Sequence, residues 1–182
     1  AVRERADSPR VSLLGASLVD ECHDFPYSGR GTRGGITHIG RRPAMADRVR
    51  KVSYCYVKVP SRAGQGVKIL SELSDAGVNL LAFSGFPQKG GKSQLDLVPE
   101  NMGALRRVAK KNGWRLSKVK RGFLITGSDA IGGVQRHMGK LATQRINVIA
   151  ADAVAAGKGR YGMILWVRPK DYNRAARALR AK

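Results

Sequence analysis

VSYCYVKVPSRAGQGVKILSELSDAGVN, residues 52–79, is the stretch that best predicts the fold of this chain. Residues 52–59 are rich in β-branched and aromatic side chains, which favour a strand, and Pro60 ends the strand because it has no backbone N–H. Gly64 predicts a tight turn, and Gly77 predicts the end of a helix followed by a new strand. Between them the apolar positions recur at helical spacing: Ile69, Leu70 and Leu73.

The chain repeats this plan at an offset of 68 residues. At this offset five pairs of positions carry the same residue or one of similar chemical type: Gly64 with Gly132, Leu70 with Met138, Leu73 with Leu141, Val78 with Ile146, and Asn79 with Asn147. In each copy a glycine hairpin then joins two apolar runs, and a proline opens a last helix. Each copy is therefore predicted to be β-α-β-β-α, and residues 114–119 predict a closing strand for the first copy.

The predicted fold class is α+β, with two ferredoxin-like (βαββαβ) repeats whose antiparallel sheets carry helices on one face. The second copy shows no closing strand of its own in the sequence. Its sheet edge is therefore expected to be filled by another subunit or left open. Two repeats of this size would each bury only about 60% of their unfolded surface, so we expect them to pack on each other or on another subunit.

The predicted domain boundaries are 1–44, 45–119 and 120–182. Residues 1–44 are rich in turn-forming and polar residues, and Met45 begins a sequence that runs directly into the first strand. We therefore expect residues 1–44 to be a disordered or non-native N-terminal extension; a regulatory arm is the alternative. Residues 45–119 and 120–182 are the two repeat domains.

Composition predicts a soluble, cytoplasmic protein with no membrane partner. Hydrophobic residues make up 42% of the 182 residues, but no apolar run approaches the ~20 residues that span a bilayer. No segment resembles a signal peptide. The two cysteines, Cys22 in the extension and Cys55 in a strand, do not form a disulfide framework, which favours a reducing compartment.

The residues that could carry chemistry do not form a recognisable set. Cys22 and His23 are adjacent, but a metal site needs three or four converging ligands. His137 lies beside an apolar helical stripe, where a packing histidine is favoured over a catalytic base. From residue 52 onward there are seven carboxylates, none paired or beside a nucleophile and a histidine: Glu72, Asp75, Asp96, Glu100, Asp129, Asp152 and Asp171. We therefore expect no catalytic residue, metal or cofactor, and a protein that is not an enzyme.

The repeated turn and helix resemble the ACT domain, the small regulatory module of amino-acid metabolism named from aspartate kinase, chorismate mutase and prephenate dehydrogenase. The matching segments are PSRAGQGVKILSELSDAGVN (60–79) and, more loosely, SDAIGGVQRHMGKLATQRIN (128–147). Both copies carry the family's glycine and asparagine, whereas Ala63 and Ile131 stand where the family has a proline. The second helix ends in Gln144 and Arg145 rather than in a glycine. By this resemblance 45–119 and 120–182 are a first and a second ACT-like domain.

The resemblance implies binding rather than catalysis. ACT modules join their sheets side by side and hold an amino acid between the glycine turn of one module and the second strand of its neighbour. Turn N–H groups can hold a carboxylate, and an asparagine amide can bond both charged ends of a zwitterion; both residues can equally be structural. The implied ligand-binding residues are Arg62, Ala63, Gly64, Gln65, Asn79 and Leu80 in the first copy, and Ala130, Ile131, Gly132, Gly133, Asn147 and Val148 in the second.

The expected function is thus a non-catalytic regulatory protein of the ACT type that binds a small molecule, an amino acid. A homodimer is expected, and any partner enzyme is not identified by the sequence.

The charge supports an alternative function, RNA binding. The net charge is +21, and residues 1–51, with ten basic and six acidic residues, account for only +4 of it. A basic surface attracts nucleic acid, although a solvated surface that keeps the protein soluble is the simpler explanation. The RNA recognition motif shares the ferredoxin-like plan and stacks bases on aromatic rings of an open sheet face. Burial of four rings between joined sheets would favour a small-ligand module, and exposure of the same rings in a basic groove would favour RNA: Tyr54, Tyr56, Phe123 and Tyr161.

Overall fold

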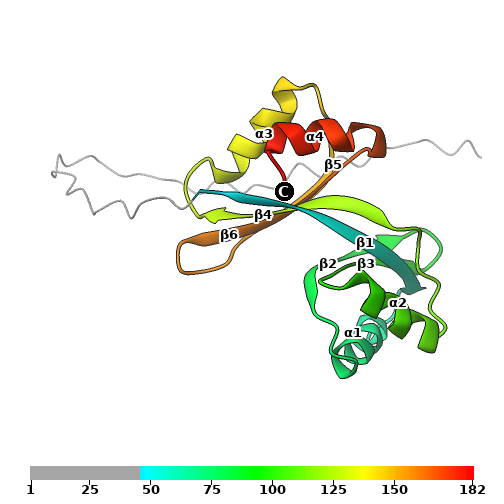
Figure 1. Cartoon of the computed structure of the whole chain (residues 1–182). Helices are drawn as coiled ribbons and strands as arrows, with labels where there is room; N and C mark the ends of the chain where they lie inside the picture. Colours follow the sequence, from blue (N-terminus) through cyan, green and yellow to red (C-terminus); the bar gives the residue numbers. More distant parts are fainter. Residues whose placement is uncertain (1–45) are drawn as a thin grey trace, which may run out of the picture. The chain divides into compact units, whose positions relative to one another are not determined.

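The computed structural model describes residues 46–182, and the predicted extension 1–44 therefore lies outside the described residues, as do Cys22 and His23. The elements are β1 (Arg48–Pro60), α1 (Gln65–Asp75), β2 (Leu80–Gln88), β3 (Lys92–Pro99), α2 (Met102–Lys111), β4 (Lys120–Ser128), α3 (Gly133–Thr143), β5 (Val148–Ala155), β6 (Arg160–Val167), the 3-10 helix η1 (Pro169–Asp171) and α4 (Tyr172–Leu179) (Figure 1). The fold class is α+β, as predicted. In residues 46–182 no helix is both long and apolar enough to cross a membrane.

The six strands form one antiparallel sheet in the order β2-β3-β1-β4-β6-β5. Strand β1 is long enough to serve both copies, because 13 residues extend over roughly 43 Å. Its C-terminal half pairs with β3, where Cys55 lies opposite Leu97. Its N-terminal half pairs with β4, where Val52 lies opposite Gly122. The copies are therefore not two complete and separate βαββαβ units, since they share β1 and β4.

Because the copies share strands, the structure differs from the prediction at the last strand of each copy. Residues 114–119 do not form a closing strand; they make a single bridge, between Leu116 and Val57, and β4 follows them. The second copy has no last strand of its own, but β1 occupies that place beside β4. The chain also returns to β1 at Lys182, whose N–H donates to the carbonyl of Val49 at 3.1 Å, while the N–H of Lys51 donates to the Lys182 carbonyl at 2.8 Å.

The helices cover one face of the sheet. Odd-numbered side chains of β1 point to the helices, because successive residues of a strand face opposite sides. Val57 and Val59 enter the core formed with α1 and α2, and Val49 enters the core formed with α3 and α4. Figure 1 shows α1 and α2 beside one half of the sheet and α3 and α4 beside the other. Cys55 is a free cysteine, buried in the first of these cores.

The opposite, helix-free faces of the two sheet halves pack against each other. Val52 and Tyr54 of β1 share a core there with Val98 of β3 and with Ile164 and Trp166 of β6. We call this cluster the inter-sheet core. The two outermost strands also meet, since the hydroxyl of Ser84 on β2 donates to Asp152 on β5 at 3.0 Å. The sheet thus curls until its helix-free face becomes an interior.

Candidate ligand-binding site

The two glycine turns have the same backbone. Gly64 precedes α1 with φ 82° and ψ −14°, and Gly132 precedes α3 with φ 79° and ψ 8°. This left-handed region favours glycine. No side chain caps either helix at this position. The first N–H groups of α1 and α3 therefore lie beside turns without a capping side chain, which suits an anionic group.

The other turn residues surround these glycines on the surface. Arg62 and Ala63 are exposed and Gln65 is half-buried in the first copy. In the second copy Ala130, Ile131 and Gly132 are exposed, whereas Gly133 is buried against the ring of Tyr161. Ala130 and Gly133 line a shallow groove of about 190 Å³ together with Val134 and Tyr161.

The asparagines lie at the far ends of the same helices. Asn79 and Asn147 directly precede β2 and β5, so an 11-residue helix of roughly 16 Å separates each from the glycine turn of its own copy. The side-chain Nδ2 of Asn79 donates to Glu100 Oε2 at 3.3 Å, and the backbone carbonyl of Asn79 accepts from the backbone N–H of Glu100 at 2.9 Å. Leu80 and Val148, the next residues along, are half-buried. A site that uses both a turn and an asparagine therefore requires two modules.

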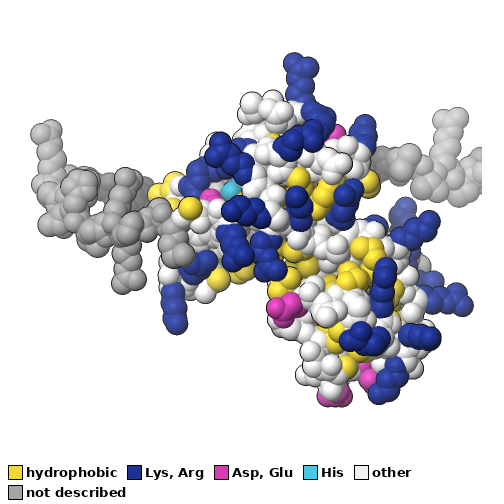
Figure 2. All heavy atoms as spheres, viewed as in Figure 1, with side chains coloured by type: hydrophobic (Ala, Val, Ile, Leu, Met, Phe, Trp, Pro, Cys, Tyr) yellow, Lys and Arg dark blue, Asp and Glu magenta, His cyan; other side chains and the backbone are white. Residues whose placement is uncertain are grey.

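The rings that would stack RNA bases are not on an open face. Tyr54, Phe123 and Tyr161 are buried, and Phe123 stacks on Tyr172 with 4.8 Å between ring centroids. Tyr56 is half-buried, and the ammonium of Lys120 lies 4.8 Å from its ring centre. In Figure 2 the Lys and Arg side chains are spread over the face shown, with hydrophobic side chains between them. Tyr54 is buried in the inter-sheet core, whereas Phe123 and Tyr161 are buried in the core with α3 and α4, so none of these three rings is exposed in a basic groove.

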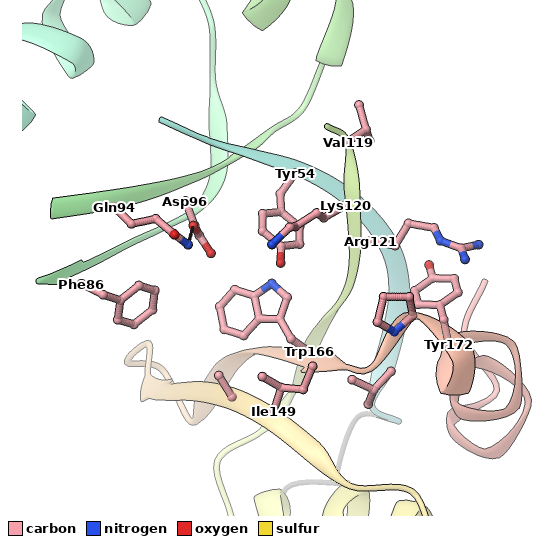
Figure 3. Close-up of a pocket in the computed structure, with 13 residues that line it drawn as sticks. Tyr54, Phe86, Gln94, Asp96, Val119, Lys120, Arg121, Ile149, Trp166 and Tyr172 are labelled. Carbon is pink, nitrogen blue, oxygen red and sulfur yellow. Dashed lines mark hydrogen bonds between the residues drawn. The ribbon is translucent and has the colours of Figure 1, made fainter. Parts of the chain in front are cut away.

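A cleft of about 450 Å³ opens at one end of the inter-sheet core (Figure 3). Its lining includes aromatic side chains from four elements, Tyr54 of β1, Phe86 of β2, Trp166 of β6 and Tyr172 of α4. Asp96 of β3, Lys120 and Arg121 of β4 contribute its charged groups. A concave, mostly apolar cavity with a few polar groups is typical of small-molecule sites.

The polar groups of this cleft have distinct environments. Asp96 is only 5% exposed, and its Oδ1 accepts from Gln94 Nε2 at 2.7 Å. Burial raises the pKa of Asp96 above its usual range. Burial, followed by the neighbouring Asp96 charge, raises the pKa of Tyr54 to about 12, so its hydroxyl stays protonated at neutral pH. The guanidinium of Arg121 lies 4.0 Å from the centre of the Tyr172 ring.

Sequence reasoning did not find this cleft. Its side chains come from different strands and share no motif, and Asp96 was counted only as an unpaired carboxylate. The one sequence signal was the position of Asp96 within an apolar strand, LDLV, where a carboxylate is unusual.

A second polar cluster joins α3 to the start of β1. His137 is buried, and its Nε2 lies 2.9 Å from Asp47 Oδ2, which also accepts from Arg136 at 3.1 Å. Burial lowers the pKa of His137, against the opposing effect of Asp47. His137 therefore packs in the interior beside a carboxylate, in the packing role favoured by the sequence. Within residues 46–182 no group of three or more His, Cys, Asp or Glu side chains converges as a metal site requires.

No family model matches this chain, and no curated protein sequence matches it. The chain is similar to many solved structures, and three of them are the following. Protein BT0572 from Bacteroides thetaiotaomicron is 12% identical, with a TM-score of 0.62, and the match covers 72% of this chain and 88% of that one. A structure of aspartokinase alpha and beta subunits is 14% identical, with a TM-score of 0.50 and coverage of 75% and 95%. The ligand-free regulatory subunit of aspartate kinase from Thermus thermophilus is 15% identical, with a TM-score of 0.49 and coverage of 75% and 95%.

At 12% and 14% identity the first two likenesses show the fold alone, an α+β fold shared with an aspartokinase structure. This agrees with the resemblance seen in the glycine turns.

Proposed function

We propose that this protein is a non-catalytic regulatory module that binds a small molecule, an amino acid, at its glycine turns. The observation that carries the proposal is the left-handed glycine repeated at the start of α1 and α3, in each case without a side-chain cap. Backbone N–H groups at a helix N-terminus carry partial positive charge and can bind the ligand carboxylate. The ACT-like fold supports the proposal.

The proposed contacts pair a turn with an asparagine from a neighbouring module. The residues of the first turn, Arg62, Ala63, Gly64 and Gln65, would hold the carboxylate. Asn147 or Asn79 of the neighbouring module would bond the other charged end, with Val148 or Leu80 beside it. The same arrangement applies to the second turn: Ala130, Ile131, Gly132 and Gly133.

We propose that the neighbouring module belongs to a second copy of the chain. Strands β2 and β5 lie at the two ends of the sheet order, and an edge strand presents unpaired N–H and C=O groups that can pair with another strand. Exposed hydrophobic side chains lie on both, Phe83 on β2 and Ile149 and Val154 on β5. Light scattering across micromolar concentrations should show a homodimer; a monomer throughout would refute this part of the proposal.

The test of ligand binding is thermal unfolding of the full chain in the presence of each of the twenty amino acids. A ligand at a hundred times its dissociation constant adds about 2.7 kcal/mol to the free energy of unfolding. Gly64→Val and Asn79→Ala should each reduce the shift, because each removes a residue of one of the two proposed sites. Gly90→Val is the matched control, because Gly90 also has a positive φ, 75°, and open space around it but lies in the β2–β3 hairpin.

A shift with one amino acid that is unchanged in Gly90→Val but reduced in Gly64→Val would support the proposal. The absence of a shift with any amino acid would refute it. A short single-stranded RNA is the contrasting ligand. Tight RNA binding that persists at moderate salt, without an amino-acid shift, would indicate the nucleic-acid alternative.

A further inference from the structure

The cleft at the inter-sheet core contains a buried carboxylate, Asp96, that forms no ion pair within residues 46–182. The ion pairs among the described residues involve Asp47 and Asp171, not Asp96. The hydrogen bond from Gln94 reaches Oδ1 of Asp96. Lys120 acts on the carboxylate electrostatically, but its side chain is exposed. A buried carboxylate is best compensated by a cation that also donates hydrogen bonds.

The same cleft contains a buried donor that has no acceptor among the described residues. Trp166 is 5% exposed, and its Nε1–H has no hydrogen-bond partner within residues 46–182. In Figure 3 this indole nitrogen points towards Tyr54 and Lys120, and the indole ring faces the cleft. Gly122 makes room for the indole, because a Cβ at Gly122 would lie 3.3 Å from Nε1. A buried N–H of this kind favours a ligand that brings an acceptor.

The charges of the cleft are separated. Figure 3 shows Asp96 and Gln94 on one side of Trp166 and Arg121 with Tyr172 on the other. Lys120 lies between, beside Tyr54. The cleft therefore presents one acidic end, a basic side and aromatic walls.

We propose that this cleft is a binding site for a small zwitterion with a flat, apolar body, of the type of an aromatic amino acid. The ligand ammonium would bond Asp96, and its anionic group would lie near Lys120, Arg121 and the Trp166 N–H. The flat body would pack on Trp166 and Phe86. A simple anion would be repelled by Asp96, and a simple cation by Lys120 and Arg121, so only a ligand with both charges compensates both ends. This site goes beyond the proposed function, because the glycine turns do not line it.

The experiment uses L-phenylalanine and the fluorescence of Trp166 in the full chain. The chain has two tryptophans, so Trp114→Phe leaves Trp166 as the only reporter. We expect a saturable change in the fluorescence emission of Trp166 as the concentration of phenylalanine increases. Two analogues test the two ends: 3-phenylpropanoate lacks the ammonium and L-phenylalaninamide lacks the carboxylate. Each should bind about tenfold or more weakly, the size expected for loss of one charged hydrogen bond.

Substitutions in the cleft test which residues bind the ammonium and the carboxylate of phenylalanine. Asp96→Asn should weaken phenylalanine binding about tenfold and leave 3-phenylpropanoate no weaker than before. Arg121→Ala should weaken phenylalanine binding and have little effect on the amide. Lys110→Ala, on the exposed face of α2, removes the same charge outside the cleft and should change neither affinity. Circular dichroism of each variant confirms that it is folded.

The outcomes separate this inference from the proposed function. If phenylalanine binding is lost in Asp96→Asn but retained in Gly64→Val, the result supports the cleft as the binding site. If phenylalanine binding is retained in Asp96→Asn but weakened in Gly64→Val, the result overturns the cleft and places the ligand at the turns. An unchanged Trp166 emission at millimolar phenylalanine also overturns the cleft, whatever the turns bind.

Discussion

Truncating one buried leucine in each half of the sheet tests whether the two copies fold as one unit. Leu97 of β3 and Leu165 of β6 are both 0% exposed, the first in the core with α1 and α2, the second in the core with α3 and α4. Replacing a buried leucine by alanine costs ~2–5 kcal/mol, from lost apolar burial and the cavity left behind. In a unit of this size each kcal/mol lowers the melting midpoint by about 3 °C, so each variant should melt roughly 6–15 °C below the wild type.

The strands that the two halves share determine whether the protein unfolds in one cooperative transition or in two. Strands β1 and β4 pair with strands of both halves, and the inter-sheet core joins β3 to β6. Unfolding either half therefore removes hydrogen-bond and packing partners from the other half. We expect Leu97→Ala and Leu165→Ala each to move a single cooperative transition.

Differential scanning calorimetry measures this directly, because the calorimetric and van't Hoff enthalpies agree for a single transition. Leu70→Ala is the control, since Leu70 on α1 is 37% exposed and should shift the midpoint by only a few degrees, about 3 °C per kcal/mol lost. Two separate transitions in Leu97→Ala, one of them at the wild-type midpoint, would refute the shared-strand reasoning. The copies would then be independent domains.

Three further predictions concern His137, Asp96 and the glycine beside Asp47. Burial lowers the pKa of His137 below the ordinary 6.5, so the folded state binds its proton less readily than the unfolded state. Stability should be full above pH 6.5 and fall as the pH drops below it, and His137→Gln should flatten that part of a melting-midpoint profile. Burial raises the pKa of Asp96, so its ionised form destabilises the fold at neutral pH. Asp96→Asn should raise the melting midpoint at pH 7, and the gain should disappear below pH 3.8, where both folded and unfolded states are protonated; an equal gain at all pH values contradicts this. A Cβ on Gly127 would overlap the Asp47 carboxylate, so Gly127→Ala should lower the free energy of urea unfolding by ~1–3 kcal/mol. Gly139→Ala, with open space in α3, should instead be neutral or stabilising.

The sequence predicted the secondary structure correctly where the pattern that indicates a turn or a helix lies within a few neighbouring residues. The helices expected after Gly64 and Gly132 are α1 and α3, and both glycines have the left-handed backbone that such a turn requires. The closing strand was misplaced, because residues 114–119 have strand-like side chains but find only one partner, at Val57. Strand pairing depends on segments distant in sequence, which local propensity does not report.

The sequence by itself determined the α+β class, the repeat at 68 residues and the two glycine turns, because each depends on side-chain spacing or on the backbone freedom of single residues. Only the tertiary structure decided that β1 and β4 serve both copies and that the helix-free face becomes an interior. The cleft depends on that curl, which brings Asp96 and Trp166 to the same cavity from strands on opposite sides of β1. Their burial, and hence their need for partners, follows from contacts between distant strands rather than from any local pattern.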